Sequence, residues 1–331
     1  MELRKLGKSQ VEVTPIAFGA WAIGGWMWGG AEVKDAVKAV KKSIDLGITT
    51  IDTAPVYGFG ISEEIIAEAT KGIRDKVQIL TKFGLRWDMN KGEFYFASED
   101  SKGNKVDIYR YAGKKSVIEE CENSLRRLKT DHIDLLQIHW PDPTTPVEET
   151  MEALDRLKEQ GKILAGGVSN YDVQLLDKAV KVTDIASNQV PYSMVNRGIE
   201  DDLVPYCIEN SIGILAYSPM QRGLLTGKFD PDHKFKEGDH RAGLYWYKKE
   251  NIKRVNDFLD KIKQVAESKD ATLSQLVLRW TLQQPGITCA LAGARNPEQV
   301  ADNAGALRFS LTDEEIGFIN RELDKLELEK E

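Results

Sequence analysis

The stretch TIDTAPVYGFGISEE, residues 49–63, passes from a short apolar strand through a turn into the start of a helix. The strand ends on a carboxylate, Asp52, and an aromatic hydroxyl, Tyr57, follows five residues later. Gly58 and Gly60 are sufficient for the turn, so neither polar side chain is needed for it. We therefore interpret this stretch as a strand, loop and helix that carry two side chains for a chemical purpose.

The same alternation of strand and helix continues along the chain. Eight apolar runs predict strands, and most of them are separated by segments with apolar residues at helical spacing. Such strands pair in parallel, and eight of them close into a (β/α)8 TIM barrel of the α/β class, with a doubly wound open sheet as the alternative. The runs are residues 16–19, 48–52, 76–84, 132–140, 162–170, 184–190, 212–219 and 287–294.

Several segments lie outside this repeat, and we expect one domain over residues 1–331. A hairpin around residues 7–9 is expected to plug the N-terminal end of the barrel. Extra helices are expected near the C-terminus, one within an insertion at 220–270 and one that begins with a capping box at Thr312 and Glu315. Residues 86–113 are expected to form a long polar loop with aromatic residues.

Two further helix starts are predicted from capping residues. Ser116 and Glu119 have the spacing of a capping box. Thr145 and Pro146, with Glu148 two residues on, predict the start of the next helix.

Composition excludes several classes of function. The 45 basic and 52 acidic residues give a net charge of −7, which offers no basic surface for nucleic acid. The charged N-terminus is unlike a signal peptide and no apolar run reaches the ~18 residues of a membrane span, so we expect a cytoplasmic protein with no membrane partner. Cys121, Cys207 and Cys289 are far apart and lack metal-ligand spacing, which predicts buried thiols and no metal.

Four polar residues are predicted to meet at the mouth of the barrel, because active sites of this fold lie at the C-terminal ends of the strands. They are Asp52, Tyr57, Lys82 and His139. We expect the Lys82 ammonium, kept charged by Asp52, to stabilise the Tyr57 phenolate, and the His139 imidazole to tune it further. This arrangement suits a proton donor to a carbonyl oxygen as hydride reaches the carbon. Taken alone, Asp52 would more often be a cap or turn former, Tyr57 a packing residue, Lys82 a solvated strand end and His139 a core histidine.

An anion site is predicted on the loops after the last two strands. Asn296 is the expected cap and Pro297 the first residue of a helix, with Arg295 beside them. The preceding loop, 217–228, adds two glycines and the cations Arg222 and Lys228, and Arg241 lies further on. These groups suit a pyrophosphate, with solvated loop charges as the alternative. Neither G-x-G-x-x-G nor a P-loop occurs.

These motifs together resemble the aldo-keto reductase family over essentially the whole chain. The resemblance rests on IDTAPVYG, TKFG, SLRRLKTDHIDLLQIHW, GGVSN, AYSPMQRGLLTGK and AGARNPEQVADN. It is greatest to bacterial and plant members and extends to the β-subunits of potassium channels, which carry asparagine at the position of His139. The resemblance implies an NADP(H)-dependent reductase of aldehydes or ketones, in which Tyr57 is the general acid and Asp52, Lys82 and His139 complete the catalytic set.

The resemblance also implies where the ligands bind. It places the nicotinamide against Tyr217 and the 2′-phosphate near Arg295, although Gly293 and Ala294 replace the Lys-Ser pair of many members. Trp21, Trp87 and Trp140 are candidate walls for the carbonyl substrate beside Tyr57 and His139, or alternatively rim packing. The expected cofactor residues are Ala20, Trp21, Asp52, Ser169, Asn170, Gln189, Tyr217, Ser218, Pro219, Met220, Gln221, Gly223, Leu224, Lys228, Arg241, Gly293, Arg295, Gln299 and Asn303.

We expect a monomer that acts on a small-molecule carbonyl compound. Two alternatives remain open from the sequence. A redox-sensing or regulatory subunit would bind NADPH with little turnover. A metal-dependent hydrolase would use Asp52 and His139 as ligands, but it needs further ligands at strand ends that the sequence does not supply.

Overall fold

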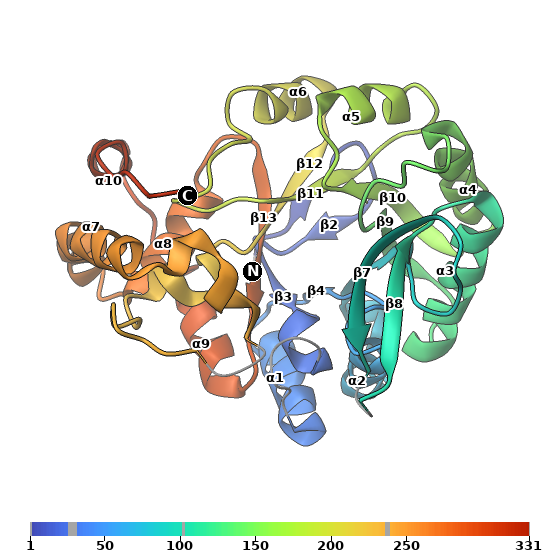
Figure 1. Cartoon of the computed structure of the whole chain (residues 1–331), viewed down its shortest axis with the longest axis horizontal. Helices are drawn as coiled ribbons and strands as arrows, with labels where there is room; N and C mark the ends of the chain where they lie inside the picture. The colour runs from blue at the N-terminus through green and yellow to red at the C-terminus, as the bar shows by residue number, and fades with distance from the viewer. Residues whose placement is uncertain (1, 26–31, 101–102, 236–238, 331) are drawn as a thin grey trace.

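The computed structural model describes residues 2–25, 32–100, 103–235 and 239–330. Its centre is a closed barrel of eight parallel strands, which confirms the predicted TIM barrel (Figure 1). In order around the barrel the strands are β3 (Ile16–Gly19), β4 (Thr50–Asp52), β5 (Gln78–Phe83), β9 (Ile133–Ile138), β10 (Ile163–Ser169), β11 (Ser187–Pro191), β12 (Gly213–Tyr217) and β13 (Ile287–Gly293).

Helices surround the barrel because each buries one apolar face against the strands. They are α1 (Val33–Asp45), α2 (Ile61–Ala69), α3 (Lys114–Leu128), α4 (Val147–Glu159), α5 (Val173–Val180), α6 (Leu203–Asn210), α8 (Leu273–Leu282) and α9 (Pro297–Gly305). Both predicted extra helices are present, as α7 (Lys249–Ser268) and α10 (Asp313–Leu323), and they lie outside α8 at one edge of the molecule (Figure 1). Single 3-10 turns occur as η1 (Ala20–Gly24), η2 (Arg74–Lys76), η3 (Gln221–Thr226), η4 (His240–Gly243) and η5 (Tyr245–Tyr247).

The N-terminal hairpin plugs the barrel as predicted. Strands β1 (Arg4–Lys5) and β2 (Glu12–Val13) pair in antiparallel fashion. Leu6 and Val11 beside them are buried in one cluster with Leu80 and other side chains that point inward from the barrel strands. The opposite, C-terminal end is therefore the end that can receive a ligand.

The predicted loop at 86–113 is wrong. Strands β6 (Leu85–Arg86), β7 (Glu93–Glu99) and β8 (Lys105–Arg110) form a separate antiparallel sheet there. Exposed and partly buried residues largely alternate along β7 and β8, which is the pattern of strands with one face covered. In Figure 1 this sheet crosses the barrel rim close to α2.

Two of the predicted helix caps are wrong, although a helix begins near each of them. Helix α3 begins at Lys114 without a side-chain cap, and the Ser116 hydroxyl instead donates to Glu120 at 3.1 Å. Helix α4 follows Pro146, which has no side chain able to accept a hydrogen bond, so Thr145 does not cap it. The caps at Asn296 and Thr312 are confirmed, since both side chains accept backbone N–H bonds of their helices.

Glu120 joins the inserted sheet to the barrel. Its carboxylate is buried and accepts hydrogen bonds from the backbone N–H of Gly84, at 3.0 Å, and from Ser116. Burial raises the pKa of Glu120 from 4.5 to about 7, against the opposing effect of Arg86. A carboxylate at the point where β5 leaves the barrel is therefore protonated more readily in the folded chain than in the unfolded one.

We expect Glu120→Gln to change how stability depends on pH. Because the folded-state pKa is raised, the stabilising contribution of Glu120 is fully present below its unfolded pKa and is lost as the pH rises through about 7. Relative to the variant, the wild type should lose up to about 3 kcal/mol of unfolding free energy between pH 5 and pH 8. Urea denaturation at several pH values measures this, with the exposed neighbour Glu119→Gln as control. If the unfolding free energies of wild type and Glu120→Gln changed with pH in the same way, this prediction would be wrong.

Candidate functional site

The four residues predicted at the strand ends come together at the C-terminal end of the barrel. The Lys82 ammonium donates to Asp52 Oδ1 at 2.7 Å and to the carbonyl of Thr53 at 2.8 Å. It lies 5.2 Å from the centroid of the Tyr57 ring. The His139 ring meets the Tyr57 ring edge-on, with 5.7 Å between centroids.

Two glycines fix Tyr57 relative to the neighbouring loop. A Cβ added to Gly24 would lie 2.7 Å from the carbonyl oxygen of Tyr57, and one added to Gly58 would collide with the carbonyl of Gly24. Gly58 also has a φ of 68°, which disfavours any side chain. This close approach brings Trp21 to 6.2 Å from the Tyr57 ring, in a stacked arrangement.

Burial dominates the protonation of this cluster. It raises the pKa of the Tyr57 phenol well above its usual value, and Asp52 and Tyr217 act in the same direction. We expected Lys82 to stabilise the Tyr57 phenolate, but each of the causes that shift the pKa of Tyr57 raises it, and desolvation is the largest. Burial likewise lowers the pKa of Lys82, which Asp52 opposes, and lowers the pKa of His139 well below 6.5. Near pH 7 Tyr57 therefore holds its proton and His139 is neutral.

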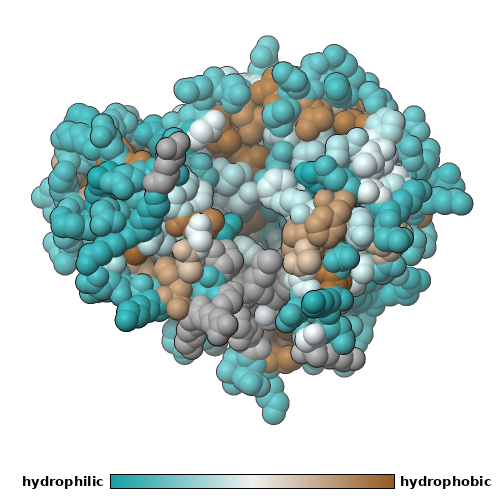
Figure 2. Space-filling view, viewed as in Figure 1, coloured by the Kyte–Doolittle hydropathy of each residue, from teal (hydrophilic) through white to brown (hydrophobic). Residues whose placement is uncertain are grey.

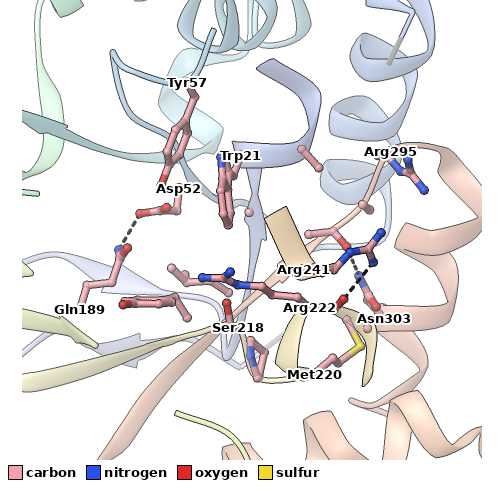
Figure 3. Close-up of a pocket in the computed structure, with 18 of the residues that line it drawn as sticks. Trp21, Asp52, Tyr57, Gln189, Ser218, Met220, Arg222, Arg241, Arg295 and Asn303 are labelled. Atoms are coloured by element: carbon pink, nitrogen blue, oxygen red, sulfur yellow. Dashed lines mark hydrogen bonds between the residues drawn. The ribbon is translucent and has the colours of Figure 1, made fainter. Parts of the chain in front are cut away.

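A hydrogen-bonded network extends from Asp52 across the adjoining strands. The Gln189 amide donates to Asp52 Oδ2 at 2.8 Å, as Figure 3 shows, and the Ser169 hydroxyl donates to the carbonyl of Gln189 at 2.8 Å. The Tyr217 hydroxyl donates to Asn170 Oδ1 at 2.9 Å. These bonds hold the polar ends of β10, β11 and β12 in one arrangement beside the Tyr57 cluster.

A cavity of about 840 Å³ runs from this cluster to the start of α9. Figure 2 shows the surface hollowed near the centre of the face toward the viewer. Most residues predicted to bind ligands line the cavity: Trp21, Asp52, Tyr57, His139, Trp140, Ser169, Asn170, Gln189, Tyr217, Ser218, Pro219, Met220, Gly223, Lys228, Arg241, Gly293, Arg295, Gln299 and Asn303.

Five predicted residues lie away from the lining. Ala20, Lys82 and Leu224 are fully buried, with Lys82 behind Asp52. The Gln221 side chain accepts a hydrogen bond from Ser193 at 2.9 Å, and Trp87 packs edge-on against Phe59.

The sequence reasoning missed part of the apolar wall. Tyr95 and Phe96 from β7 line the cavity, with Leu85 beside them. The Tyr95 ring lies 5.6 Å from that of Trp140. The aromatic run at residues 94–96 could have indicated a strand there, but nothing in it says that the strand faces the barrel mouth.

The far end of the cavity presents donors to an anion. Asn296 accepts the N–H of Gln299 and so caps α9, while the Arg295 N–H donates to the Gln299 side chain at 2.8 Å. In the loop before η3, Ser218 has a φ of 55°. In η3, the consecutive residues 221–223 all have φ between 46° and 97°. The backbone N–H groups of Gln221 and Gly223 donate to the carbonyls of Ser218 and Met220, so this tight turn is held by its own hydrogen bonds.

This lining fits a dinucleotide cofactor. A cavity of about 840 Å³ has the size of a site for such a ligand. The positive end of α9 and the side chains of Lys228, Arg241 and Arg295 in the lining supply positive charge for phosphates. The residues of the Asp52 network present amides and hydroxyls at the other end, where a polar ring substituent would bind.

Across the described ranges, no group of three or more His, Cys, Asp or Glu residues is arranged to hold a metal ion. The helices within those ranges include none that is long and apolar enough to cross a bilayer.

Comparison with known proteins gives a consistent family. A model described as "Aldo/keto reductase family" matches residues 15–324. The chain is 38% identical to aldo-keto reductase YhdN of Bacillus subtilis (strain 168), over 98% of this chain and 94% of that protein. It is 34% identical to the NADH-specific methylglyoxal reductase of Escherichia coli (strain K12), over 97% and 98% of the two chains. The solved structure of the glycerol dehydrogenase AKR11B4 from Gluconobacter oxydans is similar with a TM-score of 0.88 and 37% identity, covering 98% of this chain and 95% of that one.

Proposed function

Because the chain belongs to the aldo/keto reductase family, whose members are oxidoreductases that use a nicotinamide cofactor, we propose that it is an NADPH-dependent reductase of aldehydes or ketones. The observation that carries this proposal is the contact of Tyr57 with Lys82 and His139 at the mouth of a cavity that fits a dinucleotide. When bound, NADPH supplies the hydride.

The residues of the chain then have distinct tasks. Tyr57, protonated near pH 7, gives its proton to the carbonyl oxygen. The nearby Lys82 ammonium, held by Asp52, stabilises the phenolate that remains. His139, as a neutral imidazole, contacts the phenol ring from its edge and adds no competing charge.

Single-turnover oxidation of bound NADPH by 4-nitrobenzaldehyde tests the proposal. We expect NADPH absorbance to fall with stoichiometric formation of the alcohol. Tight NADPH binding without oxidation would instead favour the redox-sensing or regulatory subunit, for which the NADPH-binding potassium-channel β-subunits are the family precedent.

The preference for the phosphorylated cofactor is proposed from Arg295. Its side chain lines the cavity at the start of α9 and is exposed, so a 2′-phosphate could reach it. The E. coli relative that uses NADH specifically shows that the family does not fix this preference.

We expect Arg295→Glu to raise the Kd for NADPH at least about tenfold and the Kd for NADH less than about threefold. A charge-assisted contact to a phosphate dianion is replaced by repulsion, whereas NADH has no 2′-phosphate. Fluorescence titration with both cofactors measures the two constants. Arg308→Glu, an exposed change beyond the end of α9, is the matched control. An equal rise in the Kd values for NADPH and NADH would argue against a contact between Arg295 and the 2′-phosphate.

A further inference from the structure

Arg222 extends into the cavity from the loop that otherwise serves its phosphate end. Figure 3 shows its side chain pointing toward Trp21 and Asp52, whereas Arg241 and Arg295 lie toward α9. The guanidinium carbon lies 5.6 Å from the Trp21 ring centroid, and that ring stacks on Tyr57. A small molecule lying across Trp21 would therefore touch both the cation and the proton donor.

The guanidinium of Arg222 lacks a counterion among the residues that the structure describes. Arg241, by contrast, forms a two-pronged ion pair with Asp239. Partial burial lowers the pKa of Arg222, yet an arginine keeps its charge at neutral pH. A partly desolvated cation without a partner is unfavourable, so this part of the cavity favours an anionic ligand.

The backbone of Arg222 separates this anion site from the phosphate end. Its carbonyl accepts hydrogen bonds from Arg241 at 3.3 Å and from the Tyr247 hydroxyl at 3.0 Å. Its φ of 52° and ψ of 33° break the turn there, so that the side chain leaves the loop in another direction. The backbone of Arg222 thus stays in the phosphate-binding loop, whereas its guanidinium lies beside the Trp21 ring.

The surroundings of Arg222 limit what the anion can be attached to. Trp21, Tyr95, Phe96 and Trp140 supply aromatic surface along the same cavity. Such walls bind an apolar body, and a guanidinium binds a carboxylate through paired N–H donors. We propose that Arg222 binds the carboxylate of the substrate, so that the preferred substrates are oxo-acids: carbonyl compounds with a carboxylate on an apolar body. This rests on the proposed reductase function.

Two aldehydes of matched shape test the inference. 4-Carboxybenzaldehyde carries the carboxylate, and 4-formylbenzamide is its uncharged counterpart. In the wild type kcat/KM should be at least about tenfold higher for the acid than for the amide, as expected for a hydrogen-bonded ion pair. Arg222→Gln should bring that ratio close to one, and Arg222→Lys, which keeps the charge, should retain part of it. Lys91→Gln, which removes an exposed cation on the adjacent inserted segment, should leave the ratio unchanged.

Binding measurements separate this inference from the proposed function. Calorimetry should show the wild type binding 4-(hydroxymethyl)benzoate at least about tenfold more tightly than 4-(hydroxymethyl)benzamide, and Arg222→Gln should lose this difference. Absence of turnover with both aldehydes would count against the reductase proposal, while the binding comparison would still decide the role of Arg222. An unchanged selectivity in Arg222→Gln would overturn the inference. So would a tenfold loss of NADPH affinity at unchanged selectivity, which would assign Arg222 to the cofactor phosphates.

Discussion

Tyr57→Phe is expected to reduce aldehyde turnover by at least about 100-fold, the lower end of the range for loss of a general acid. The substitution keeps the ring that stacks on Trp21 and meets His139 edge-on, but removes the proton that the carbonyl oxygen must receive. The Kd for NADPH should change less than about twofold. Single-turnover kinetics with 4-nitrobenzaldehyde, together with fluorescence titration of NADPH, measures both effects.

Tyr192→Phe is the matched control for this experiment. The Tyr192 hydroxyl donates to Glu200 at 2.6 Å, and the residue does not line the cavity. Loss of the Tyr192 hydroxyl should lower the free energy of unfolding, while aldehyde turnover stays close to that of the wild type. If Tyr57→Phe retained normal turnover, another group would have to supply the proton.

Lys82→Met is expected to lower both turnover and stability. Asp52 would keep the hydrogen bond from Gln189 but lose its charged partner, and a buried carboxylate left without its cation costs about 3 to 5 kcal/mol. Turnover should fall by at least about 100-fold, since the Tyr57 phenolate also loses its nearby positive charge. Urea denaturation and single-turnover kinetics measure the two losses separately.

The double variant Lys82→Met with Asp52→Asn distinguishes the two effects. Removing the uncompensated carboxylate should restore much of the unfolding free energy, because no buried charge then remains unpaired. Turnover should stay low, because the cation beside Tyr57 is still absent. A Lys82→Met protein with stability within about 1 kcal/mol of wild type would contradict the expected cost of leaving the buried Asp52 carboxylate without its cation.

The barrel could be predicted because its strands are short apolar runs at regular intervals. Parallel pairing then places all strand ends on one side, so Asp52, Lys82 and His139 had to meet once the fold was recognised. The cap at Asn296 followed from local chemistry alone, since it involves a backbone N–H only three residues away.

What depends on tertiary contacts could not be predicted in this way. The segment of β7 and β8 was interpreted as a loop because its aromatic residues are scattered among many polar ones, and the barrel rim that covers one face of the sheet is distant in sequence. Trp87 was left open between a cavity wall and rim packing, and the structure shows it packed edge-on against Phe59. The pKa of Tyr57 rises chiefly because burial desolvates the phenol, and the depth of burial is invisible in a sequence.

The contact between Gly24 and Gly58 has a mechanical consequence. Two loops that touch backbone to backbone cannot tilt independently, so the aromatic surface at Trp21 and the hydroxyl of Tyr57 behave as one rigid piece. The distance between the Tyr57 hydroxyl and the Trp21 ring is thus set by two residues that have no side chain, and neither of them needs to contact a ligand.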